Sequence, residues 1–339
     1  MASIGEVARE AGVSITTVSH VFSGKRPVAP ETRRRVLDVA ARLGYRPHRA
    51  ARGLATGRAM TIGLHFPFGV DSFVLDPYFP ELLEGMSAAA VEAGYGFVMI
   101  PASPGTRFPL KLALKQRRFD GVIMANPAKD SSLIPMLLRR QIPLVTIGRY
   151  LGADQVPWVD NDLRGAMAQL MAHLAEQAYR RPALISLQST FSCDQDVEES
   201  FEKEVRVRGG EVRIVRADDL SEEQGFLLTL RLLSQPVPPD AVVASTDRLA
   251  IGVLRAASEL SVRIPRDLGV IGMDDSVLAR HSHPPLTSVR VGPHSLGQAA
   301  IESLLTIVEH SEVPDNRVLP AELVPRASTR RNRRRSTRA

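Results

Sequence analysis

The chain has 339 residues, of which 44% are apolar, so it can bury more than one substantial core, and a disordered or fibrous protein is excluded. Its single cysteine excludes an intramolecular disulfide, and no apolar run reaches the roughly 20 residues that cross a bilayer. The net charge of +6 is uneven: residues 1–59 carry 11 Lys/Arg against 4 Asp/Glu, and residues 326–339 carry 7 Arg and no acid, whereas the middle carries 25 against 33. The ends are therefore expected to meet a polyanion, unless their charge serves solubility alone.

The first 45 residues predict three short helices. Ser3 and Glu6 have the spacing of a capping box, which predicts a helix from about Ile4 to Glu10. Ser14 can cap a second helix, from Ile15 to about Phe22, after a turn that Gly12 permits. Apolar residues at helical spacing after Pro30 predict a third helix over residues 31–43, and Val18 and Val21 are expected in the small core.

The stretch IGEVAREAGVSITTVSHVFSG closely matches the signature V-A-x-x-A-G-V-S-x-x-T-V-S-x-V, and the chain thereby resembles the LacI/GalR repressor family. The resemblance implies a helix-turn-helix whose second helix enters the major groove. Ile15, Thr16 and His20 are then the candidates that read base edges. Ser14, Thr17 and Ser19 are candidates for phosphate contacts, although any one of these residues taken alone would be more typical of a solvated helix face.

The Arg-rich segment 47–59 resembles the family's hinge helix, which folds on the minor groove when two copies pair. Leu54 matches the apolar wedge that enters the central base step, and Arg49 and Arg52 are expected near phosphates. The alternative is an ordinary basic linker with one exposed leucine.

From residue 60, apolar runs alternate with helical patterns in two successive series. The first runs from TIGLHF to PLVTIG and includes an expected helix over residues 110–118, and the second runs from a helical pattern at Leu163–Ala178 to LGVIGMDD and includes an expected helix at Asp196–Arg208. This alternation is typical of βαβ units and predicts an α/β fold with two doubly wound, mainly parallel sheets. Ligands of such sheets bind outside the carboxyl ends of the strands, so a cleft between two subdomains is expected.

Further motifs continue the resemblance to about residue 329, among them DPYFPELLEGM, STDRLAIGVLRA, GVIGMDD and PPLTSVR. They imply a body similar to periplasmic sugar-binding proteins, with a small-molecule effector, a sugar or related metabolite, held between two lobes whose closure is the switch. The effector-site candidates carried over by position are Phe73, Asp76, Tyr78, Trp158, Asp160, Val197, Thr246, Asp247 and Asp274.

Each effector candidate has a structural alternative. Asp76 and Asp247 can cap helices, Asp274 can orient its loop, and Trp158 can belong to the core. Val197 and Thr246 depart from the family, which usually has Arg and Asn at these positions. Since Val cannot donate the forked hydrogen bonds of Arg, this departure argues against ordinary monosaccharide binding.

An enzyme is the main rival interpretation, together with a sugar-transport component, which would need an export signal. The catalytic candidates are Cys193, the pair Asp274 and Asp275, and the cluster His281-Ser282-His283, none of which has a recognisable catalytic frame. His281 and His283 lack a third plausible metal ligand. We therefore expect no catalytic site, no metal and no cofactor.

The expected organisation is a helix-turn-helix domain at 1–46, a hinge at 47–59, a body of two interleaved subdomains at 60–326, and a basic disordered tail at 327–339. The tail has no Leu heptads of the kind that join two dimers, so a homodimer is expected. Together these features predict a cytoplasmic, effector-controlled repressor that binds double-stranded DNA with a pseudo-palindromic operator and does not associate with membranes.

Overall fold

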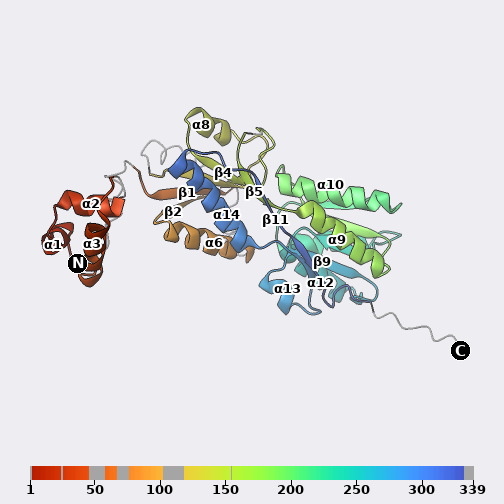
Figure 1. Cartoon of the computed structure of the whole chain (residues 1–339). Coiled ribbons are helices and arrows are strands. Elements are labelled where there is room, and N and C mark those ends of the chain that lie inside the picture. The colour runs from red at the N-terminus through yellow and green to blue at the C-terminus, as the bar shows by residue number, and fades with distance from the viewer. Residues whose placement is uncertain are drawn as a thin grey trace.

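A computed structural model describes residues 2–23, 26–45, 58–66, 76–101, 118–153 and 155–331. Three N-terminal helices form one unit, and a larger α/β body forms two lobes (Figure 1). Within the described residues, no helix is long and apolar enough to cross a membrane.

The N-terminal unit consists of α1 (Ile4–Glu10), α2 (Ile15–Ser23) and α3 (Pro30–Arg42). The predicted capping box at α1 is present, since Ser3 accepts the backbone N–H of Glu6 and Glu6 accepts that of Ser3. Eight buried side chains of Val and Ala form the core of this unit, including the predicted Val18 and Val21. The three predicted helices are therefore confirmed, and each of their ends lies within one residue of the predicted position.

The N-lobe is a six-stranded sheet in the order β11-β5-β4-β3-β1-β2. Its strands are β1 (Thr61–Phe66), β2 (Gly96–Pro101), β3 (Gly121–Ala125), β4 (Leu144–Ile147), β5 (Trp158–Asn161) and β11 (Arg317–Leu319), all parallel. Helices α6 (Tyr78–Glu92) and α14 (Pro293–Leu305) pack on one face, and α8 (Leu133–Arg139) packs on the other. A short π-helix, η1 (Thr306–His310), follows α14.

The C-lobe is a second six-stranded sheet, in the order β12-β10-β9-β8-β6-β7. Its strands are β6 (Pro182–Leu187), β7 (Ile214–Ala217), β8 (Ala241–Ala244), β9 (Gly269–Asp274), β10 (Thr287–Arg290) and β12 (Glu322–Val324), of which only β12 is antiparallel to its neighbour. The covering helices are α9 (Leu163–Glu176) and α10 (Ser192–Val207) on one face, and α11 (Glu222–Leu233), α12 (Asp247–Glu259) and α13 (Val277–His281) on the other.

Side-chain alternation on β6 shows why these strands are apolar throughout. Leu184 points to the α9 and α10 face, whereas Ala183 and Ile185 point to the α11 and α12 face. Every residue of β6 is buried, because helices cover both faces of the sheet. The predicted α/β class with two doubly wound parallel sheets is confirmed.

The chain crosses between the lobes three times: after β5, between β10 and α14, and between β11 and β12. As a result α14, drawn in blue, lies against α6 in the N-lobe although it comes late in the sequence (Figure 1). Residues 317–319 and 322–324, although close in sequence, form two short strands in different sheets. The two lobes are therefore connected by three separate segments of the chain, which together form the hinge between them.

Two further expectations differ from the structure. Helix α10 begins at Ser192, four residues before the expected start at Asp196, and no side chain caps it. The packed chain also continues beyond residue 326, where a disordered tail was expected: Ser328 and Thr329 are fully buried, and the hydroxyl of Ser328 accepts the N–H of Thr287 and donates to the carbonyl of Val270. The expected helix over residues 110–118 lies almost wholly outside the described residues.

Candidate functional site

The start of α2 presents the predicted DNA-reading residues. The hydroxyl of Ser14 accepts the N–H of Thr17 at 3.0 Å and thereby caps the helix. The hydroxyls of Ser14 and Thr17 are also hydrogen-bonded to each other, so both take part in the helix start. Ile15 remains 54% exposed although it is apolar, and Thr16 beside it is also exposed. Ser19 and His20 lie half-buried further along the same helix.

The core of the unit fixes this exposed end. Val18 and Val21 pack against Val7 and Val36, while Nη1 of Arg33 donates to the carbonyl of Val21 at 3.2 Å. A helix start held outward by a rigid core, with no acidic residue in its first turn, suits a major groove lined by phosphates. The hinge candidates Arg49, Arg52 and Leu54 lie outside the described residues.

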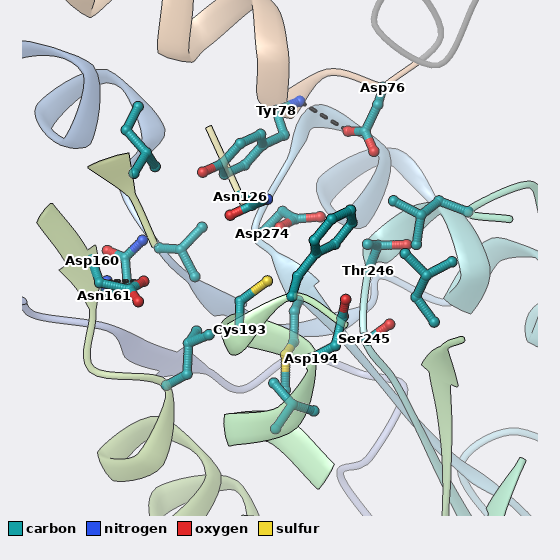
Figure 2. A pocket seen from close by; sticks show the side chains of 18 of the residues that line it. Asp76, Tyr78, Asn126, Asp160, Asn161, Cys193, Asp194, Ser245, Thr246 and Asp274 are labelled. Carbon is teal, nitrogen blue, oxygen red and sulfur yellow. Dashed lines mark hydrogen bonds between the residues drawn. The ribbon is translucent and has the colours of Figure 1, made fainter. Parts of the chain in front are cut away.

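A cavity of about 120 Å³ lies between the two lobes. Its polar lining comes from both: Asp76, Tyr78, Asn126, Asp160 and Asn161 from the N-lobe, and Cys193, Asp194, Ser245, Thr246 and Asp274 from the C-lobe (Figure 2). The other lining residues are Phe79, Ile147, Leu163, Leu187, Phe191, Val197, Leu220, Met273, Val291 and Leu296. A ligand in this cavity would touch both lobes, so its binding can favour one relative arrangement of them.

Six of the nine effector candidates line this cavity: Asp76, Tyr78, Asp160, Val197, Thr246 and Asp274. Two others do not. Asp247 is directed instead to the start of α13 and to β10, where it accepts hydrogen bonds from Ser276 and Ser288. Trp158 lies two residues before Asp160 on β5 and is absent from the lining. Phe73 lies outside the described residues.

The structural roles of two candidates follow from their contacts. Thr246 caps α12, since its hydroxyl accepts the N–H of Leu249, and it still borders the cavity. Asp76 precedes α6, and its Oδ1 accepts the N–H of Tyr78 at 3.0 Å (Figure 2). Thr246 and Asp76 therefore each hold the start of a helix and also line the cavity.

The lining residues that the sequence interpretation missed are polar residues at strand ends. Asn126 follows β3, Asn161 ends β5 and Ser245 follows β8, so all three lie at the carboxyl ends of parallel strands, where ligands of such sheets bind. Position at the end of a buried strand was therefore the signal that could have identified them. Cys193 and Asp194, in contrast, depend on the early start of α10, which no capping residue announces.

Burial dominates the electrostatics of the cavity. It raises the pKa of Asp160 to about 6 and that of Asp194 to about 6, although Asp160 accepts the N–H of Asn161 and Asp194 accepts the hydroxyl of Ser189. Burial also raises the pKa of Asp76, and raises the pKa of Asp274 well above its ordinary value. Removal of these carboxylates from water makes their charged forms costly until a ligand compensates them.

An ion-pair cluster joins the lobes beside the cavity. Arg149, two residues after β4 of the N-lobe, donates from Nη2 to both carboxylate oxygens of Asp196 on α10, at 2.5 and 2.6 Å. Arg164 on α9 donates to Oδ1 of Asp196 at 2.6 Å. Since Arg149 and Asp196 belong to different lobes, separation of the lobes here would break a charge-assisted contact.

Two of the catalytic candidates, Cys193 and Asp274, line the same cavity, whereas Asp275 does not. Burial raises the pKa of the Cys193 thiol, which disfavours the reactive thiolate. Asp275 does not pair with Asp274, because it turns to Arg326 at 2.5 Å and Arg290 at 2.8 Å. Among the residues that the structure describes, no group of three or more His, Cys, Asp or Glu side chains could hold a metal ion.

The raised pKa values predict how stability depends on pH. A carboxyl whose pKa rises from 3.8 to about 6 on folding contributes stability that is complete below pH 3.8 and is lost as the pH rises to about 6. Asp194→Asn is therefore expected to raise the free energy of unfolding at pH 7.5 by about 2 kcal/mol. Urea denaturation at several pH values measures this effect.

The matched control is Asp218→Asn, at an exposed acid, which should leave the pH dependence unchanged. A lower stability of Asp194→Asn at pH 7.5 would mean that the ionised carboxylate is a net stabilising group, and would contradict the prediction.

Comparisons with known proteins agree with this two-part organisation. The family model of bacterial regulatory proteins of the lacI family matches residues 3–48, and that of a periplasmic binding protein-like domain matches residues 171–329. The HTH-type transcriptional regulator AglR of Rhizobium meliloti (strain 1021) is 32% identical, over 96% of this chain and 94% of its own length. The regulator CelR of Thermobifida fusca is 31% identical, over 95% of this chain and 96% of its own length.

A solved structure is similar over the whole length. The complex of the transcriptional regulator CelR with cellobiose has a TM-score of 0.74 and 29% sequence identity, and the match covers 97% of this chain and all of that one. The likeness thus includes both the N-terminal helices and the two lobes.

Proposed function

The chain belongs to the LacI family of bacterial DNA-binding transcriptional regulators, and we propose that it is a repressor whose operator affinity is set by an effector in the interlobe cavity. The observation that carries this proposal is the combination of an exposed α2 start on the N-terminal unit with a cavity lined by both lobes of the body. The first feature suits sequence readout, and the second suits a ligand-dependent switch.

In this proposal the base-reading residues are Ile15, Thr16 and His20, while Ser14, Thr17 and Ser19 contact phosphates. Leu54 wedges into the minor groove of the operator, with Arg49 and Arg52 near the backbone. The phosphate contacts fix the register of the protein on DNA, and the base contacts select the half-site.

A homodimer supplies the two readers that a pseudo-palindromic operator requires. Support comes from exposed apolar side chains of the N-lobe, namely Val98 and Met99 on the edge strand β2 and Val91 on α6. An unpaired edge strand with exposed apolar side chains is typical of a surface that another chain covers. Effector binding changes the angle between the lobes and so alters the spacing of the two hinge segments.

The effector is a small metabolite of the carbohydrate class, as the cellobiose complex of the relative CelR suggests. Effector and operator must affect each other's binding by the same factor, whether the effector releases the protein or tightens it on DNA. The proposal places the protein in the cytoplasm, where the operator is, and assigns it no catalytic activity.

The experiment is selection of genomic fragments by the purified full-length protein at a stated salt concentration, followed by affinity measurement. We expect the selected fragments to share one pseudo-palindrome, and Leu54→Ala to weaken binding to it about tenfold or more, because the wedge no longer offsets the cost of unstacking. If the unaltered protein and Leu54→Ala both bind all fragments weakly and equally, the basic ends of the chain only contact polyanions in general, and the proposal is contradicted.

A further inference from the structure

The lining of the interlobe cavity is unbalanced in charge. Four carboxyl groups border it, from Asp76 before α6, Asp160 on β5, Asp194 on α10 and Asp274 at the end of β9. Among the described residues that line the cavity there is no Lys, Arg or His. Val197 occupies the position at which an Arg was expected, and its side chain is 3% exposed within the core under α10.

Two polar side-chain atoms without hydrogen-bond partners accompany these carboxyls. Oδ1 of Asn161 and Oγ of Ser245 are both buried and have no hydrogen-bond partner in the structure, and both residues line the cavity. They belong to different lobes, Asn161 to β5 and Ser245 to the end of β8 (Figure 2). A buried polar atom without a partner costs free energy until one reaches it. An N–H or O–H donor on a ligand would satisfy Oδ1 of Asn161, and a ligand hydroxyl could either donate to the Ser245 hydroxyl or accept from it.

The cations nearest the cavity belong to other contacts. Arg149 is held by both oxygens of Asp196, and Arg164 by Asp196 and Glu199. Arg248, on α12, lies close enough to Asp76 to lower its pKa but is not part of the lining. The four carboxyls therefore face the cavity without a cation inside it.

These observations discriminate between ligand classes. An anionic ligand is disfavoured by a lining that offers four carboxyls and, among its described residues, no cation, and a metal ion lacks a group of three ligands among the described residues. A neutral sugar offers hydroxyl donors to the carboxyls but adds no positive charge to a lining that contains none among its described residues. A protonated amine supplies both the positive charge and several donors, and the rings of Tyr78 and Phe191 add apolar surface beside it.

We infer that the cavity takes a polyhydroxylated ligand carrying at least one protonated amine, the chemistry of an amino sugar. This inference rests on the proposed role of the cavity as the effector site. The amine lies near the carboxyls of Asp160 and Asp194, and the hydroxyls bond to Asn161 and Ser245.

Calorimetric titration of the full-length protein with three disaccharides of similar size tests the inference. The probes are the β-1,4-linked dimer of glucosamine, its N,N′-diacetyl form, which carries no charge, and cellobiose, which has hydroxyls in place of the amines. Titration at about pH 6.5 stays below the ordinary pKa of an α-amino group, about 7.7 to 8.0, so amines of comparable basicity are mostly protonated. We expect the glucosamine dimer to bind roughly tenfold or more tightly than either neutral probe.

Variants locate this preference in the cavity. Asp160→Asn and Asp194→Asn remove one charge each at nearly constant shape, and either should reduce the ratio of affinities for charged and neutral probes by roughly fivefold or more. Asp218→Asn, at an exposed acid outside the cavity, should leave the ratio unchanged. Thermal unfolding of each variant verifies that it is folded.

A glucosamine dimer that binds no better than cellobiose or the diacetyl form, or that does not bind, overturns the inference, as does an unchanged ratio in both cavity variants. Fragment selection separates this failure from that of the proposed function. A protein that selects an operator but shows no preference for the amine contradicts the ligand class alone, whereas a protein that selects no operator contradicts the regulatory role itself.

Discussion

Thr16→Ala and His20→Ala are each expected to reduce operator affinity by about 10- to 100-fold, which corresponds to about 1–3 kcal/mol for loss of a base contact. Thr16 is exposed at the start of α2, and His20 lies one turn further along, so the two side chains share one side of the helix. Because the contacts are to bases, each variant should also relax the preference at particular positions of the half-site. Affinity measured over a set of half-site variants gives both effects.

Ser19→Ala provides the comparison within the same helix. A phosphate contact carries no sequence information, so its loss should weaken binding to all DNA sequences alike and leave the base preferences unchanged. If Thr16→Ala and His20→Ala behave in the same manner as Ser19→Ala, the start of α2 does not read bases, and the assignment of the recognition residues is wrong.

Asp247→Ala is expected to lower the free energy of unfolding by about 3 kcal/mol, since it removes a buried carboxylate that accepts several hydrogen bonds. Asp247 is 1% exposed. Its Oδ2 accepts the N–H of Ser276 at 2.7 Å and the hydroxyl of Ser276 at 2.8 Å, and its Oδ1 accepts the hydroxyl of Ser288 at 2.5 Å. These bonds tie α12 to the start of α13 and to β10, and the variant leaves three donors unpaired.

Urea denaturation of the variant measures this loss. Asp247→Asn keeps one acceptor oxygen, so its free energy of unfolding should lie between those of Asp247→Ala and the unaltered protein. Thr246→Ser retains the hydroxyl that caps α12 and should change the free energy of unfolding little. A fully stable Asp247→Ala that no longer binds an effector would show that Asp247 is a ligand contact, as its position in the sequence suggested.

The local elements could be predicted because short-range signals specify them. Ser3 with Glu6, and Ser14 before α2, mark helix starts through caps that the structure contains. The apolar runs predicted buried strands because helices cover both faces of each sheet. Where no such signal exists, prediction failed: α10 starts after Phe191 with no side-chain cap, and its start was placed four residues late.

The crossovers and the cavity depend on long-range order. No local pattern says that α14 returns to the N-lobe, or that residues 317–319 and 322–324 belong to different sheets. For the same reason the position of Asp247 in a family motif did not reveal that its carboxylate turns away from the cavity. Resemblance identified six lining residues, and the carboxyl ends of the strands would have added Asn126, Asn161 and Ser245.

The chemistry of the cavity also qualifies what the family resemblance implies. Val197 stands where the family usually has Arg, and this departure argued against ordinary monosaccharide binding. The four carboxyls in the cavity lining now indicate which kind of ligand would fit instead, one that carries a positive charge. The family resemblance predicts where the effector binds, and we infer the charge of the effector from the side chains of this chain.

The central claim, that two α2 helices read one operator through a symmetric dimer, is tested most directly by the spacing of half-sites in the fragments that the protein selects. We predict two inverted half-sites whose centres lie about one helical turn, 10 to 10.5 base pairs, apart. A shared site without inverted symmetry, or half-sites tolerated at any spacing, would contradict the account, because independent readers and not a paired dimer would then bind the DNA.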